Sequence, residues 1–137
     1  DPLTFSTYCY LLQQLSKLIP SEKIHTIPGI TSYNAAASLA NFSLIEQSEK
    51  LAIVPVSSDI SELRPILNSF DTVILMKVAK KLDEVIELLE DMELIDNSLF
   101  ASYIGFENEL ITRDLLSLKG AGKGYLSVII VRKPTHT

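Results

Sequence analysis

Short apolar runs separated by helical patterns constrain the second half of this chain more than any other feature. Residues 51–55 and 72–76 are almost entirely apolar, and residues 125–131 are rich in β-branched side chains. Continuous apolar runs of this length are typical of strands covered on both faces of a sheet. Helical patterns occupy residues 59–69 and 82–91. Strands that alternate with helices predict a layered α/β domain with a sheet flanked by helices.

Less regular patterns predict the remaining elements. A helix is expected over about residues 5–19, a strand over 23–27, and a third strand over 99–104. Thr31 or Ser32 can cap a helix that continues to Ala40 and carries small residues on one face. Residues 110–118 are ambiguous and fit either a strand or a helix. Pro65 is expected to lie in the first turns of its helix or to produce a bend.

A polar, punctuated stretch over residues 41–49 is the candidate linker between two units. It predicts that residues 1–45 end one domain and that residues 46–137 form an α/β domain. The chain also begins at Asp1-Pro2 without methionine, directly before a helical pattern. We expect that a preceding part of the protein is missing; a processed terminus is the alternative.

The composition narrows the class of protein and its partners. With 47% hydrophobic and 21% charged residues, the chain has the composition of a globular domain. Its formal charge of -5 argues against nucleic acid or an anionic membrane as the main partner, although a local basic site stays compatible with it. No apolar run approaches the ~20 residues that span a bilayer. The single cysteine fits a reducing compartment, so we expect a cytoplasmic protein.

The sequence gives little support for a metal site, a Cys–His nucleophile pair or a phosphate-binding loop. His25 and His136 have no ligand-spaced partner, so no metal site is expected. Cys9 is interpreted as a structural thiol and not as the nucleophile of a Cys–His pair. The glycines of residues 120–124 precede a strand and not a helix, which favours a turn over a phosphate-binding loop. The acidic residues of 83–91 fit the solvated face of an amphipathic helix.

Three stretches indicate ligand binding. Residues 1–4 place a turn against a helix start, where free amide groups point outward. Residues 28–32 place a tight turn with two hydroxyls before the small-residue helix. Met76 and Lys77 end a buried strand, which is where ligands collect in open α/β sheets. These features predict ligand-binding turns without naming the ligand.

The same stretches resemble the tetrapyrrole methylase family, the S-adenosylmethionine enzymes of corrin and siroheme synthesis. Asp1-Pro2 is similar to the family's Gly-Asp-Pro turn without its glycine, and residues 28–37 are similar to its Pro-Gly-Ile-Thr turn and alanine-rich helix. Within the family, residues 1–8, 72–78 and 103–109 look most like the members that methylate C20 of precorrin-2. The resemblance covers essentially the whole chain.

The resemblance implies the C-terminal portion of a two-domain α/β fold, with S-adenosylmethionine as cofactor and precorrin-2 or cobalt-precorrin-2 as substrate in cobalamin biosynthesis. It also implies a homodimer and weak or no activity for this portion alone. A family member acting on another position of a later intermediate and a non-catalytic cofactor-binding module are the alternatives. The cofactor contacts that it implies are Asp1, Thr4, Thr31, Ser32, Met76, Gly105, Phe106 and Ser127.

For the substrate, Lys77 is the local candidate for binding carboxylates, and Tyr8 is a second candidate. A sulfonium methyl group is already activated, so its transfer mainly needs alignment and no Ser, Cys or His nucleophile. A base that removes the C20 proton is not assigned. Tyr8 and Glu107 are conceivable bases, and both are better explained as structural.

Overall fold

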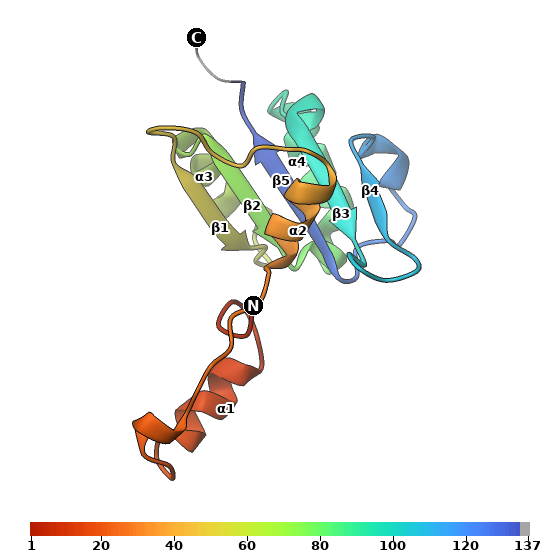
Figure 1. The fold of residues 1–137 in the computed structure, drawn as a ribbon. Helices are drawn as coiled ribbons and strands as arrows, with labels where there is room; N and C mark the ends of the chain where they lie inside the picture. The colour runs from red at the N-terminus through yellow and green to blue at the C-terminus, as the bar shows by residue number, and fades with distance from the viewer. Residues whose placement is uncertain (135–137) are drawn as a thin grey trace.

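The computed structural model describes residues 1–134, which form one mixed sheet with helices on both faces and a projecting N-terminal arm (Figure 1). This confirms the expected α/β fold. The helices are α1 (Tyr8–Leu15), α2 (Ser32–Leu39), α3 (Leu63–Ser69) and α4 (Leu82–Asp91). The strands are β1 (Leu51–Pro55), β2 (Thr72–Met76), β3 (Ser98–Ser102), β4 (Leu110–Thr112) and β5 (Ser127–Arg132).

The strand order β1-β2-β5-β3-β4 brings four strand ends to one edge of the sheet. β1 and β2 are parallel, so Pro55 pairs with Met76 where both strands end. β5 runs antiparallel between β2 and β3, so Val128 pairs with Met76. Ser127, at the start of β5, pairs with Ser102, at the end of β3. The carboxyl ends of β1, β2 and β3 and the amino end of β5 therefore meet.

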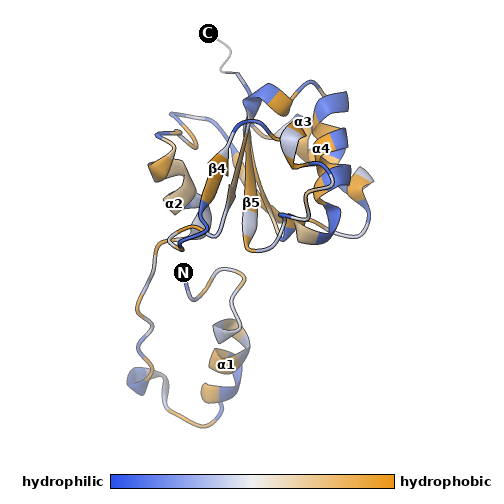
Figure 2. Cartoon of the chain, turned by 90° about the vertical axis from the view of Figure 1, so that its right-hand side faces the viewer, coloured by the Kyte–Doolittle hydropathy of each residue, from blue (hydrophilic) through white to orange (hydrophobic). Residues whose placement is uncertain are grey.

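Apolar side chains bury both faces of the sheet. α3 and α4 cover one face, and α4 places Leu82, Val85, Ile86 and Leu89 inward at helical spacing. α2 covers the other face, as Figure 2 shows from the side. Its buried Ala36 and Ala37 let the helix approach the sheet closely, so the small-residue face packs on strands.

An arm of residues 1–30 extends from the sheet edge where the strand ends meet (Figure 1). Its helix α1 has no buried residue. The Tyr8 hydroxyl lies 2.8 Å from Thr26 Oγ1, and this hydrogen bond joins α1 to the segment that returns to the sheet. At its root, Asp1 Oδ2 accepts a hydrogen bond from the Gly29 amide at 3.1 Å. The two turns singled out in the sequence are thus in contact.

Several expected boundaries are wrong, because a partner strand is missing or because the backbone turns left-handed. Residues 23–27 form no strand: Ser21–Lys23 is a 3₁₀ turn, and Ile24 is extended but has no neighbouring strand within residues 1–134. The first helix spans Tyr8–Leu15 and not 5–19, since Phe5 has a positive φ of 54°. The third strand ends at Ser102, because Tyr103 has a φ of 51°.

Three other expectations have mixed outcomes. β1 is an edge strand whose Ile53 is 36% exposed, so it is not covered on both faces, whereas β2 is. The ambiguous segment 110–118 divides into strand β4 and a 3₁₀ turn at Leu116–Leu118. Thr31 caps α2 by accepting from the Asn34 amide at 3.4 Å, and Pro65 lies in the first turn of α3, as expected.

Arg132 ties the linker of residues 41–49 to the end of β5. Its Nη1 donates to the Ser43 carbonyl at 2.8 Å, and its Nη2 contacts Glu46 Oε1 at 3.0 Å and Glu49 Oε2 at 3.1 Å. The side chains of Arg132 and Glu49 are only 15% and 16% exposed. The hydrogen bond from Arg132 lowers the pKa of Glu46 below its ordinary value. This cluster fixes the linker against the sheet; the proposed domain boundary at residue 45 stays a prediction.

We expect Arg132→Gln to lower the free energy of unfolding by about 1–3 kcal/mol, because it leaves the largely buried Glu49 carboxylate without its cation. Urea unfolding followed by circular dichroism measures this change. The Glu46 carboxyl group, whose folded-state pKa is lowered by its hydrogen bond from Arg132, stabilises the fold above its ordinary pKa of 4.5 and loses that contribution as the pH falls. The difference between the two proteins should therefore shrink below pH 4.5.

Arg64→Gln is the matched control, since the Arg64–Asp91 ion pair is 48% and 67% exposed and exposed pairs contribute at most about 1 kcal/mol. Equal unfolding midpoints for the two variants at neutral pH would contradict the role given to Arg132.

Candidate functional site

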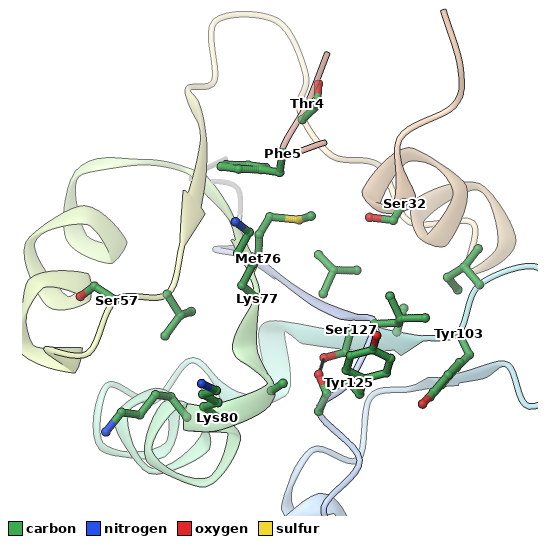
Figure 3. Close-up of a pocket in the computed structure, with 18 of the residues that line it drawn as sticks. Thr4, Phe5, Ser32, Ser57, Met76, Lys77, Lys80, Tyr103, Tyr125 and Ser127 are labelled. Atoms are coloured by element: carbon green, nitrogen blue, oxygen red, sulfur yellow. Dashed lines mark hydrogen bonds between the residues drawn. The ribbon is translucent and has the colours of Figure 1, made fainter. Parts of the chain in front are cut away.

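A cavity of about 720 Å³ opens where the strand ends meet (Figure 3). Met76 and Val128, a pair at the ends of the central strands β2 and β5, line it, as do Phe5 of the arm and Ser32 of α2. Cavities of roughly 300–1,000 Å³ at such sheet edges are typical small-molecule sites. The arrangement therefore provides a mainly apolar compartment for a small ligand.

A smaller hollow of about 340 Å³ adjoins this cavity and shares Thr4, Ser32, Met76 and Ile104 with it. Asp1 and Thr31 line this second hollow. Asp1 also accepts hydrogen bonds from the amides of Leu3 and Gly29, so its carboxylate orders both turns. The two hollows are therefore neighbours that share part of their lining.

Most residues expected to bind a ligand lie on these two hollows. The residues on the larger cavity are Thr4, Ser32, Met76, Lys77, Phe106 and Ser127, and those on the smaller hollow include Asp1 and Thr31. Gly105 lies between two lining residues without lining either hollow, and its amide donates to Glu109 Oε2 at 2.8 Å. Tyr8 and Glu107 line neither hollow, and Glu107 is exposed.

The backbone is strained around the cavity. Phe5, Lys77, Tyr103 and Leu126 all line it and all have positive φ angles, between 46° and 58°. Left-handed backbone at a non-glycine residue costs of order 1–3 kcal/mol and persists where surrounding contacts fix it. Such residues cluster at ligand sites, which supports a functional role for this edge of the sheet.

The polar groups of the cavity are hydroxyls and ammonium groups. Lys77, Lys80 and Lys81 line it, and no Asp or Glu does among its described lining residues. The buried Ser127 hydroxyl donates to the Gly124 carbonyl, so it is satisfied within the protein. The Lys77 ammonium lies 5.4 Å from the centroid of the Phe5 ring, a cation–π contact between arm and sheet.

Sequence reasoning missed several lining residues, among them Phe5, Lys80 and Lys81 and two further groups. Val56, Ser57 and Ser58 follow β1, and Tyr103 and Tyr125 flank β3 and β5. The first group had an available signal, since residues after parallel strands collect at one sheet edge. The two tyrosines had none, because the strand order that brings their strands together is not local in the sequence.

Other reactive groups form no catalytic constellation in the part of the chain that is described. Within residues 1–134, no three His, Cys, Asp or Glu side chains cluster as metal ligands. His136 lies outside the described residues, so the expectation of no metal site stays a prediction.

Cys9 is partly buried and its thiol points to the Pro2 carbonyl at 3.7 Å. Residues 120–124 form neither a helix nor a strand and lead towards β5, so no helix follows the glycines. None of the described helices is long and apolar enough to cross a membrane.

A mixed sheet with a ligand-sized cavity at its strand ends defines an α/β domain of the small-molecule-binding class. Residues 1–119 match the family model of the tetrapyrrole (corrin/porphyrin) methylases. The chain therefore belongs to this methyltransferase family.

Two curated relatives carry a more specific name. The cobalt-precorrin-2 C(20)-methyltransferase of Salmonella typhimurium is 28% identical over 134 residues, which are 97% of this chain and 55% of that protein. A probable cobalt-precorrin-2 C(20)-methyltransferase of Methanocaldococcus jannaschii is 31% identical over 93 residues, which are 68% of this chain and 38% of that protein. This chain thus spans about half the length of the curated relatives that it matches.

Solved structures agree on the fold. A cobalt precorrin-4 methyltransferase superposes with a TM-score of 0.69 at 16% identity, over 98% of this chain and 62% of that chain. The uroporphyrin-III C-methyltransferase from Thermus thermophilus, solved with S-adenosyl homocysteine, gives a TM-score of 0.62 at 19% identity, over 97% of this chain and 62% of its own. These likenesses support the α/β architecture of this family.

The turn that closes the cavity depends on Gly124, because a Cβ atom there would lie 2.5 Å from the Ala79 Cα. We expect Gly124→Ala to push the two turns apart and to lower the free energy of unfolding by about 1–3 kcal/mol. Urea unfolding measures the change. Gly29→Ala is the control, since its nearest contact would be 3.5 Å and it should change stability by less than about 1 kcal/mol. A Gly124→Ala protein as stable as the control would refute the close approach.

Proposed function

We propose that this chain binds S-adenosylmethionine in the strand-end cavity and contributes to methylation of C20 of precorrin-2 or cobalt-precorrin-2. The observation that carries the proposal is the match over 97% of the chain to a protein named for that reaction. The chain's family is a methyltransferase family, and the cofactor and the methylated carbon belong to the proposal.

The cavity suits this cofactor in size and chemistry. Its lining is mainly apolar, with Val56, Met76, Ile104 and Val128 available to pack against an adenosine group. The hydroxyls of Thr4 and Ser32, and Thr31 in the adjoining hollow, can hydrogen-bond to the polar parts of the cofactor. When bound, S-adenosylmethionine supplies an activated methyl group.

The residues of this chain would then act by positioning. Alignment of nucleophile, methyl carbon and sulfur is the main requirement of methyl transfer, and holding reactants in line can supply several kcal/mol of the barrier. The substrate carries its own carbon nucleophile. A site of apolar surfaces, hydroxyls and ammonium groups is therefore consistent with the reaction.

The substrate is proposed to be cobalt-precorrin-2, since both curated relatives above are named for the cobalt form. Lys77 lines the cavity and is exposed, and we assign it to the carboxylates of this substrate. The proposal also includes a cytoplasmic homodimer. Exposed apolar side chains of the arm, such as Leu18, Ile27 and Ile30 at 79–84% exposure, supply surface for such contacts.

Methyl transfer can be tested in two forms of the protein. We expect the 137-residue chain alone to turn over weakly or not at all, because it spans about half the length of its relatives. A chimaera in which this chain replaces the matching segment of the Salmonella protein should transfer a ¹³C-methyl group from S-adenosylmethionine to C20 of cobalt-precorrin-2. NMR of the product identifies the methylated carbon.

The Salmonella protein without the segment is the control. Methylation of another carbon by the folded chimaera would favour the alternative family reaction. Cofactor binding without methyl transfer would favour a non-catalytic module. Rapid turnover by the 137-residue chain alone would refute the expected weak activity.

A further inference from the structure

The cavity is locally cationic in an acidic protein. The chain has 17 acidic and 12 basic residues, with a formal charge of -5. Three of its lysines nevertheless line one cavity, at Lys77, Lys80 and Lys81, and no described carboxylate side chain lines it with them. A concave surface with one sign of charge attracts ligands of the opposite sign. The three ammonium groups therefore favour an anionic ligand group in this cavity.

The three lysines differ in their partners. Lys81 is paired, since its Nζ lies 2.8 Å from Glu84 Oε1. Lys77 rests over the Phe5 ring. Lys80 has neither an acidic nor an aromatic partner among residues 1–134, and its side chain is exposed. Lys80 is therefore the ammonium group most available to an incoming anion.

The turn that carries Lys80 is held in place on both sides. Val78 is fully buried, and the Ala79 backbone packs against Gly124 so closely that no Cβ would fit there. After Lys80, the Lys81–Glu84 pair and the buried Leu82 start α4. The backbone of Lys80 is thus pre-organised while its ammonium group stays free, which reduces the entropy lost when it binds a ligand.

We propose that Lys80 is a carboxylate-recognising residue of this cavity, an inference that rests on the proposed function. Two carboxylates could reach it, that of the amino-acid part of the cofactor and those of the tetrapyrrole. An ammonium group binds a carboxylate through a charge-assisted hydrogen bond. Figure 3 places Lys80 and Tyr103 on opposite sides of the cavity, so an anionic group at Lys80 would lie across from an aromatic surface.

Calorimetric titration of the 137-residue chain with three probes tests the proposal. The probes are S-adenosylhomocysteine, 5′-methylthioadenosine, which lacks the amino-acid carboxylate, and cobalt-precorrin-2. The proteins are wild type, Lys80→Gln, Lys80→Arg and the control Lys50→Gln. Lys50 directly precedes β1, at the opposite end of the sheet from the cavity.

We expect Lys80→Gln to weaken binding of at least one carboxylate probe about tenfold, as loss of a charge-assisted hydrogen bond does. Lys80→Arg should restore affinity, and Lys50→Gln should match wild type. Weaker binding of S-adenosylhomocysteine with unchanged 5′-methylthioadenosine assigns Lys80 to the cofactor. Weaker binding of cobalt-precorrin-2 alone assigns it to the tetrapyrrole.

Two results would overturn the proposal in distinguishable ways. If wild type binds S-adenosylhomocysteine and Lys80→Gln binds every probe equally well, Lys80 has no such role and the proposed function stands. If wild type binds neither S-adenosylhomocysteine nor cobalt-precorrin-2, the proposed function fails and the role of Lys80 fails with it.

Discussion

The antiparallel insertion of β5 between β2 and β3 is the constraint on which the rest of the structure depends. Ile74 pairs with Ile130 and Leu99 pairs with Ile130 from the other side, and all three are buried. Because β5 runs opposite to its neighbours, its first residues lie beside the last residues of β2 and β3. Ser127 and Val128 thereby reach the same edge as Met76. Without this insertion, the cavity would lose Ser127 and Val128 from its lining.

The edge that β5 creates is shaped by strained and closely packed turns. Lys77 and Tyr103 leave their strands, and Leu126 enters β5, through left-handed backbone, and Gly124 lets one turn press against Ala79. On the other side, the carboxylate of Asp1 holds the root of the arm above the cavity. Rigid walls of this kind suit a reaction that needs alignment more than a chemical group from the protein. The fold and the proposed methyl transfer are consistent in this respect.

The sequence predicts the elements that local patterns define and misses those that distant pairing defines. The apolar run of β2 and the helical spacing of α4 give these elements within the bounds observed. Residues 23–27 have strand-like residues but lack a partner strand, and β1 was expected to be covered although it lies at an edge. In the site, Met76 was predictable as the end of a buried strand. Local pattern also predicts the ligand-binding turns at residues 1–4 and 28–32, whereas the expectation for Ser127 came from family resemblance alone. Tyr103 and Tyr125 reach the site through a strand order that no local pattern reveals.

The chain's two methionines allow a direct measurement of whether the strand-end cavity binds the adenosyl cofactor. Met76 lines the cavity, whereas Met92 packs against the core beneath the opposite face of the sheet. NMR of the protein labelled with ¹³C at the methionine methyl groups should show two signals. Addition of S-adenosylhomocysteine should shift the Met76 signal and leave the Met92 signal in place. A saturating titration that moves neither signal, or that moves Met92 alone, would contradict the account.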